Sequence, residues 1–186
     1  MGDEKLAKIC EEIYAKHKKA LDLIFEYKPD RAMDIAHIFH KWLSEMTDKG
    51  ELIADLETSN KTIIRFKTET MSEILPDAEN VLSGWNTKNF YFYEIINRSG
   101  YDYRIQFVVS SKNIPDDLRK ICDRINEIFP AKMQKENWQW RNHFHTSKRK
   151  IDESIDEEEL IKNLNADWVK IKEFEKRLKK ELGLQP

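Results

Sequence analysis

Residues 137–150, NWQWRNHFHTSKRK, hold the side chains with the greatest potential for chemistry. His143 and His145 are two positions apart, and on a strand this spacing projects both imidazoles to one side, as metal-binding strands do. A metal centre needs at least one further His, Cys or carboxylate. The other histidines, His17, His37 and His40, fall in predicted helices far away in the sequence. We therefore expect no metal or other cofactor here, and surface, packing or ligand contact remain as the alternatives.

The same region is locally basic. Residues 131–150 contain one acid, Glu136, and six basic residues: Lys132, Lys135, Arg141, Lys148, Arg149 and Lys150. Across the whole chain the charges nearly cancel, with 32 Lys and Arg against 34 Asp and Glu and a net charge of -2. A surface for a polyanion therefore has to arise from local segregation of charge. A solvated charged surface accounts for the same pattern.

Apolar residues recur at intervals of three and four in two segments near the N-terminus, which predicts amphipathic helices over residues 4–27 and 30–49. Pro29 separates the two segments, and Gly50 is a stop signal for the second. We interpret residues 1–50 as a helical hairpin or connector that precedes an α+β domain over residues 51–186.

The rest of the sequence changes period. Aromatic and β-branched runs predict strands at 61–68, 89–97, 101–110 and within 137–150, the second and third joined as a hairpin through residues 98–100. A helix is expected over 116–129, and a capping box formed by Asp156 and Glu159 predicts a long final helix. The order ααβββαβα indicates an α+β fold with an antiparallel sheet of about four strands and helices packed over one side.

Alternation along the strands predicts which side chains leave the core. If Ile64 and Phe66 point inward, Arg65 and Lys67 point away, and in the last strand Trp138, Trp140 and Phe144 would anchor the core. The outward side chains would form a basic surface suited to phosphate, although an ordinary solvated face has the same composition. The candidate nucleic-acid-binding residues are Arg65, Lys67, Arg104, Arg141, His143, His145, Lys148, Arg149 and Lys150.

One long run carries a family resemblance: NKTIIRFKTETMSEILPDAENVLSGWNTKNFYFYEIINR, residues 60–98. It resembles the C-terminal region of a bacterial family in the PD-(D/E)XK nuclease superfamily, and the preceding HKKALDLIFEYKPDRA is similar to the helical connector of those proteins. The likeness extends over about residues 16–182. In the family, an acid on one strand and Glu/Asp-x-Lys on the next hold a divalent cation and activate water.

That catalytic pattern is not recognisable in this sequence. Only residues 3–5 (Asp-Glu-Lys) and 26–28 (Glu-Tyr-Lys) fit acid-x-Lys, and both lie in the first predicted helix. Glu94 is on a predicted strand but is followed by two isoleucines. The resemblance therefore implies a non-catalytic accessory domain that binds or positions DNA or RNA. Magnesium would be needed only if a nuclease core exists elsewhere, as in a longer parent protein.

A protein-interaction or dimerisation module is the alternative function. The large aromatic residues exceed what one sheet face can bury, because both phases of residues 90–93 are aromatic. Those that could form a surface for a second copy or another protein are Trp85, Phe90, Tyr91, Phe92, Tyr93, Trp138 and Trp140. Cys10 and Cys122 read as buried thiols, and no membrane-spanning run is present, so we expect a cytoplasmic protein with no membrane partner.

Overall fold

The computed structural model describes residues 3–28, 30–78, 83–110, 114–132, 138–154 and 156–184. The chain divides into two compact units, residues 1–30 and 31–186. The first unit contains α1 (Asp3–Glu26), which leaves helical backbone angles at His17 (φ -121°, ψ 20°) and buries none of its residues. Cys10 is therefore exposed, and the prediction that it is buried is wrong. A single helix has an apolar face but no second element within its own unit to cover it.

The second unit is built on a six-stranded antiparallel sheet. Five strands follow one another in space as they do in sequence, and β6 pairs with β4. The strands are β1 (Ile53–Asn60), β2 (Ile63–Lys67), β3 (Tyr91–Ile96), β4 (Asp102–Ser110), β5 (Trp140–His145) and β6 (Arg149–Lys150). This confirms the α+β class and the antiparallel sheet, with more strands than the four expected from the sequence.

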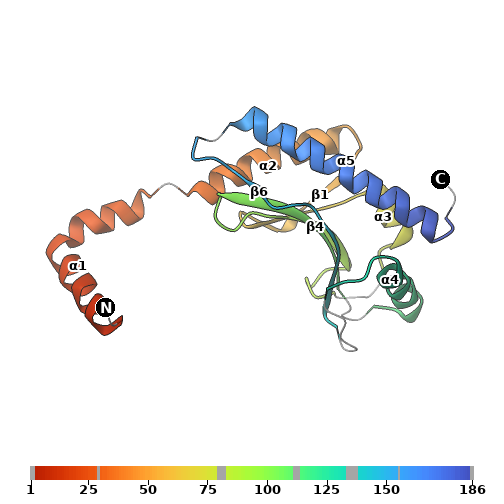
Figure 1. Cartoon of the computed structure of the whole chain (residues 1–186), viewed down its shortest axis with the longest axis horizontal. Helices are drawn as coiled ribbons and strands as arrows, with labels where there is room; N and C mark the ends of the chain where they lie inside the picture. The colour runs from red at the N-terminus through yellow and green to blue at the C-terminus, as the bar shows by residue number, and fades with distance from the viewer. Residues whose placement is uncertain are drawn as a thin grey trace. The chain divides into compact units, whose positions relative to one another are not determined.

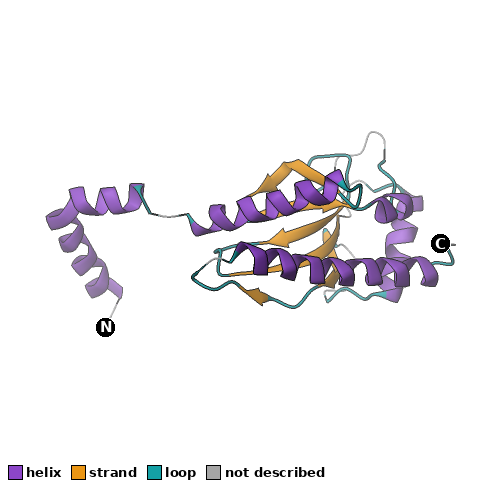
Figure 2. Ribbon diagram, turned by 90° about the horizontal axis from the view of Figure 1, so that it is seen from above, coloured by secondary structure: helices purple, strands orange, loops and turns teal. Residues whose placement is uncertain are grey.

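Two long helices, α2 (Arg31–Asp48) and α5 (Glu157–Glu181), lie over one face of the sheet, while the shorter α3 (Glu69–Ile74) and α4 (Asp116–Ile128) lie toward one end of it (Figures 1 and 2). Trp42 of α2 meets Phe66 of β2 and Trp168 of α5, each with ring centroids 6.3 Å apart. The core therefore lies between the sheet and this helical layer. The predicted packing of helices over one side is confirmed.

The strands alternate between this core and the opposite surface. Phe66, Tyr93 and Phe107 pack in one aromatic layer under the helices, with Phe66 and Tyr93 stacked at 5.3 Å and Tyr93 and Phe107 at 5.1 Å. Arg65 and Glu94, which neighbour Phe66 and Tyr93 in the sequence, are register partners and point to the opposite side of the sheet. The surface away from α2 and α5 is called the open face below, and its strand residues are Ile63, Arg65, Glu94, Ile96, Gln106, Val108 and Asn142.

Strand β5 does not follow the simple alternation that the sequence predicts. Phe107 pairs with Phe144 but Val108 pairs with Asn142, so one residue, His143, is inserted as a bulge. Phe144 remains on the helical side, where it stacks on Phe174 at 4.8 Å. Residues before the bulge change face, which places Trp140 on the open face and not in the core. The predicted orientation of Trp140 is therefore wrong.

Arg31 ties the start of α2 to two distant loops. Its Nε donates to the carbonyl of Gly100 at 2.8 Å, and its guanidinium also donates to the carbonyls of Glu153, at 2.8 Å, and Asp152. Gly100 has a φ of +77°, which favours glycine, and a Cβ there would lie 2.7 Å from the Arg31 side chain. The predicted hairpin turn at residues 98–100 is thus confirmed, and it packs directly on α2.

Candidate functional site

A hollow of about 550 Å³ lies on the open face, within the size range of ligand sites. Four strands, the loops before β3 and after α4, and the turn between β3 and β4 contribute to it. Its aliphatic lining comes from Ile63, Ile96, Val108 and Ala131, and its polar and aromatic lining from Arg65, Trp85, Glu94, Arg98, Gln106, Lys132, Trp140, Arg141 and Asn142.

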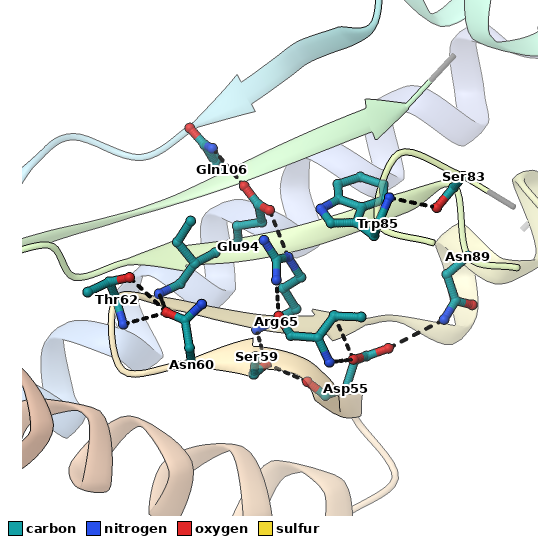
Figure 3. Close-up of polar contacts among 12 residues, drawn as sticks. Asp55, Ser59, Asn60, Thr62, Arg65, Ser83, Trp85, Asn89, Glu94 and Gln106 are labelled. Carbon is teal, nitrogen blue, oxygen red and sulfur yellow. Dashed lines mark hydrogen bonds and ion pairs between the residues drawn. The ribbon is translucent and has the colours of Figure 1, made fainter. Parts of the chain in front are cut away.

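A row of hydrogen-bonded side chains crosses the sheet beneath this hollow. Arg65 Nε donates to Glu94 Oε1 at 2.9 Å, and Gln106 Nε2 donates to Glu94 Oε2 at 2.9 Å (Figure 3). Asn142 Nδ2 then donates to Gln106 Oε1 at 2.8 Å. These four residues, one from each of β2 to β5, are called the polar row below. Each member fixes the orientation of the next.

Glu94 sets the direction of the whole row. Paired with Arg65, it is an acceptor at both oxygens, so Gln106 has to present its amino group to Glu94 and its carbonyl to Asn142. Asn142 in turn uses its amino group, and its Oδ1 is buried with no hydrogen-bond partner in the described part of the chain. Leaving a buried acceptor unpaired costs about 1–3 kcal/mol. The groups of the row that remain for a ligand are therefore the second N–H of Gln106 Nε2 and of Asn142 Nδ2.

The charged end of the row is well compensated. The exposed fraction is 9% for Arg65 and 6% for Glu94. Besides Glu94, Arg65 donates through Nη1 to the carbonyl of Thr58, and its guanidinium carbon lies 5.9 Å from the Trp85 ring centroid. A buried ion pair persists when both ions retain hydrogen bonds, and this pair meets that condition. It is thus a rigid part of the sheet surface.

Two tryptophans form an aromatic wall of the hollow. The ring centroids of Trp85 and Trp140 are 4.5 Å apart at an interplanar angle of 63°, and Trp85 also meets Phe92 edge-on at 4.9 Å. Gly84 permits this approach, because a Cβ at that position would lie 2.4 Å from the Trp140 ring. The Gly84 amide donates to Ser110 Oγ at 2.9 Å, which holds the loop on β4. Trp140 keeps 37% of its surface exposed.

A second, smaller hollow of about 290 Å³ adjoins the first on the same face. Both are lined by Ile96 and Arg98. The smaller one is completed by Ser99, Asp102, Arg104 and Lys148. Together the two hollows are lined by two acids, Glu94 and Asp102, and by six basic residues: Arg65, Arg98, Arg104, Lys132, Arg141 and Lys148. The open face therefore carries the local excess of positive charge that the neutral chain as a whole lacks.

Half of these cations are already engaged by carboxylates. Arg65 pairs with Glu94, Arg141 Nη1 lies 2.7 Å from Asp123 Oδ1, and Lys148 Nζ lies 2.7 Å from Asp102 Oδ2. The other three, Arg98, Arg104 and Lys132, are exposed and have no ion-pair partner among the described residues. They are called the free cations below. They are the groups on this face that could pair with an external anion without breaking an internal bond.

The structure separates the nine residues proposed from the sequence as nucleic-acid contacts. Arg65 and Arg141 line the larger hollow, and Arg104 and Lys148 line the smaller one. Lys67 is 8% exposed and donates to Asp77 Oδ1 at 2.6 Å and to Asn89 Oδ1 at 3.0 Å. It therefore holds the loop before β3 and lines neither hollow.

The remaining candidates also lie outside both hollows. Arg149 is directed to α5, where its Nε donates to the fully buried Asp167 at 2.6 Å, and Lys150 lies beside a different hollow that is rich in carboxylates. His143 is buried, with Nδ1 at 2.8 Å from the Phe129 carbonyl oxygen, whereas His145 is exposed. Burial lowers the pKa of His143, which favours the neutral ring. Residues 141–150 are consequently not one continuous basic surface.

The structure also bears on a metal site at the histidines and on an exposed aromatic surface. Within the described ranges, no group of three or more His, Cys, Asp and Glu side chains is arranged to hold a metal ion. All four aromatic residues at 90–93 have exposed fractions of 1% or less, and Trp138 has 6%. Of the seven aromatic residues named as a possible partner surface, the 90–93 run is therefore excluded, because the helices cover one phase of it and the Trp85 loop covers Phe92.

No protein-family model, curated protein or solved structure matches the chain. The site is thus interpreted from its own geometry. Among the helices described, none is both long enough and apolar enough to cross a membrane.

Sequence reasoning missed several lining residues. Arg98 and Lys132 lie in loops, and simple alternation gives Asn142 the same inward direction as Phe144, which the bulge at His143 reverses. The available signals were the Ser-Gly-Trp sequence at 83–85, where glycine allows close packing of a ring, and the charged Glu94 within the otherwise apolar strand β3.

Proposed function

We propose that this chain is a non-catalytic module that binds nucleic acid on its open face. The observation that carries the proposal is the position of the three free cations, Arg98, Arg104 and Lys132, around two adjoining hollows. Phosphate contacts from Arg and Lys supply most of the affinity of non-specific nucleic-acid binding. The aromatic wall of Trp85 and Trp140 adds a surface for bases next to those cations.

Charge distribution supports this interpretation. The chain has a net charge of -2, yet the two hollows are lined by six basic and two acidic residues. Such local segregation raises the local concentration of an anionic ligand even when the whole protein is near neutral. Because the internal ion pairs of Arg65, Arg141 and Lys148 satisfy three of the cations, the effective attraction comes from the free cations.

The accessory role follows from the sequence resemblance. A region similar to the C-terminal part of PD-(D/E)XK nucleases would hold or orient the strand, while hydrolysis and magnesium would belong to a separate nuclease core. The described residues provide ion pairs and hydrogen bonds on the open face but no metal-binding cluster. We further propose that the protein acts in the cytoplasm, where bacterial nucleic acid is found.

A direct binding measurement tests this proposal. Fluorescence anisotropy of labelled single-stranded and duplex DNA and RNA would be recorded at about 50 mM and about 200 mM salt, a range in which phosphate-dependent binding weakens strongly. We expect binding at the lower salt that decreases at the higher salt. Absence of binding to all four polymers at the lower salt would contradict the proposed function.

A charge-matched control separates the open face from general electrostatics. The test variant is Arg98→Gln/Arg104→Gln/Lys132→Gln. The control, Lys162→Gln/Lys176→Gln/Lys180→Gln, removes the same charge from exposed positions of α5 on the other side of the sheet. The first variant should weaken binding and the second should leave it nearly unchanged. Equal losses in both would indicate non-specific attraction and contradict an open-face site.

A further inference from the structure

We propose that the larger hollow receives an unpaired nucleobase, so that the ligand of the open face is a single strand and not a duplex. This inference rests on the proposed function and specifies its substrate class. Three features carry it: an exposed and braced Trp140, a hollow of about 550 Å³ beside it, and a polar row in which the Gln106 and Asn142 amino groups each keep a second N–H.

The aromatic wall is held in place from several directions. Trp140 is in a paired strand, Trp85 packs against it at 4.5 Å, and Phe92 supports Trp85 at 4.9 Å. Gly84 brings its backbone so close to the Trp140 ring that no larger residue fits. A ring fixed in this way loses little conformational entropy on stacking with a ligand. Its exposed fraction of 37% leaves ring surface for a base.

The floor beside the ring can read the edge of a base. Gln106 and Asn142 both line the hollow, are only partly buried, and have orientations set by Glu94. Each uses one N–H of its amino group within the row, which leaves its second N–H. Carboxamides combine a donor and an acceptor, as the edges of bases do. Asn142 Oδ1 is itself enclosed, so a base in the hollow would be read through the second N–H of the Gln106 and Asn142 amino groups.

The free cations fit a strand whose base enters the hollow. Arg98 lines both hollows, Lys132 lines the larger and Arg104 the smaller. A backbone that crosses them keeps its phosphates near the rim, with one base turned toward Trp140. In a duplex the bases are stacked and paired inside the helix, so they cannot reach the ring unless they are unpaired at a cost of a few kcal/mol. Stacking thus selects for single strands.

Three probes of the same length in nucleotides test this inference: a single-stranded DNA, its blunt duplex, and an abasic strand. We expect the single strand to bind at least about tenfold more tightly than the other two, which corresponds to the contribution of one stacked base. Trp140→Ala should reduce single-strand affinity by about tenfold and leave abasic binding unchanged, while Trp140→Phe should retain most of it.

The outcomes distinguish this inference from the proposed function. Equal, salt-dependent binding of all three probes, unaffected by Trp140→Ala, would overturn base insertion while the nucleic-acid interface stands. No binding of any probe at low salt would overturn both. The abasic strand also monitors folding, because a Trp140→Ala variant that loses abasic binding as well is misfolded. In that case Trp140→Phe becomes the test variant. It should keep the preference for the single strand over the abasic strand. Loss of that preference would count against stacking.

Discussion

Gln106 on β4 donates a hydrogen bond from Nε2 to Glu94 Oε2 on β3 at 2.9 Å, between residues that are register partners. Arg65 reaches the other carboxylate oxygen of Glu94 from β2. One carboxylate therefore joins three strands on the surface that we propose as a binding site. The polar row gives the open face its shape before any ligand arrives.

Replacement of Glu94 by alanine should strongly destabilise the second unit. Arg65 would lose its buried counter-ion and Gln106 its acceptor, and breaking one side of a buried pair costs about 3–5 kcal/mol. Urea unfolding followed by circular dichroism measures this loss. The exposed pair of Arg124 and Glu127 provides the control, since Glu127→Ala should change stability by less than about 1 kcal/mol.

The double variant Arg65→Leu/Glu94→Leu sharpens this prediction. Removing both ions together leaves no unpaired charge, so it should be markedly more stable than Glu94→Ala alone. If Glu94→Ala and the double variant unfold at the same urea concentration, the Arg65–Glu94 pair does not stabilise the sheet in the way described.

Glu175→Gln should make stability less dependent on pH. Burial raises the pKa of Glu175 above its usual range, although Thr68 and Tyr93 donate hydrogen bonds to Oε1 that oppose the rise. The unfolded chain releases this proton near pH 4.5, whereas the folded chain holds it to a higher pH. The folded state is therefore favoured by the bound proton at low pH, and this contribution to stability is lost as the pH rises through the folded pKa. Glutamine cannot ionise, so this loss disappears.

We expect Glu175→Gln to match the natural chain near pH 4 and to be more stable than it near pH 7. Thermal or urea unfolding across this pH range provides the measurement. Glu173→Gln, on the exposed side of the same helix, should show no such divergence. A Glu175→Gln variant less stable than the natural chain at pH 7 would mean that the carboxylate is stabilised by its neighbours.

Arg31→Ala should loosen the junction between α2 and the loops that it holds. The side chain donates to the carbonyls of Gly100, Ile151, Asp152 and Glu153, and loss of several such bonds should cost about 2–3 kcal/mol. Urea unfolding measures the change, with Ser44→Ala on the exposed side of α2 as a control expected to remain within about 0.5 kcal/mol. Equal stability of both variants would show that the Arg31 contacts contribute little.

Gly84→Ala should displace Trp140 and destabilise the fold. The added Cβ would lie 2.4 Å from one ring atom of Trp140 and 2.9 Å from Ser110 Oγ, and overpacking of this kind costs about 1–3 kcal/mol. Unfolding of the single variants and of Gly84→Ala/Trp140→Ala tests the cause. Because the double variant removes the clashing ring, its loss should be smaller than the sum of the two single losses. Strict additivity would contradict the contact.

Much of the second unit was predictable because burial left a clear pattern in the sequence. The runs that became β2, β3 and β4 are aromatic and β-branched, and the capping bond from Glu159 N to Asp156 Oδ1, at 3.1 Å, formed as expected. Strand β1 escaped prediction because it lies at the sheet edge, where Ile53 and Leu56 are exposed by 55% and 67%. Its apolar residues therefore carry no alternating signal.

The candidate site was only partly predictable. Local alternation correctly put Arg65 and Arg104 away from the core, but it could not show that Arg65 is satisfied by Glu94. Ion pairs between neighbouring strands decide which cations remain for a ligand. Which residues face each other depends on the strand register, which local alternation does not give. The bulge at His143 likewise reversed the face of the sheet to which Trp140 and Asn142 point. A single inserted residue cannot be recognised from the composition of the strand.

The salt dependence of single-stranded DNA binding tests the central claim most directly. Plotting the logarithm of the binding constant against that of salt concentration gives a slope of about -0.7 for each phosphate contact on a single strand. The variant Arg98→Gln/Arg104→Gln/Lys132→Gln removes three cations of the open face. Its slope should be shallower than that of the natural chain by about 2, while the α5 control variant keeps the original slope. An unchanged slope in the open-face variant would contradict the account.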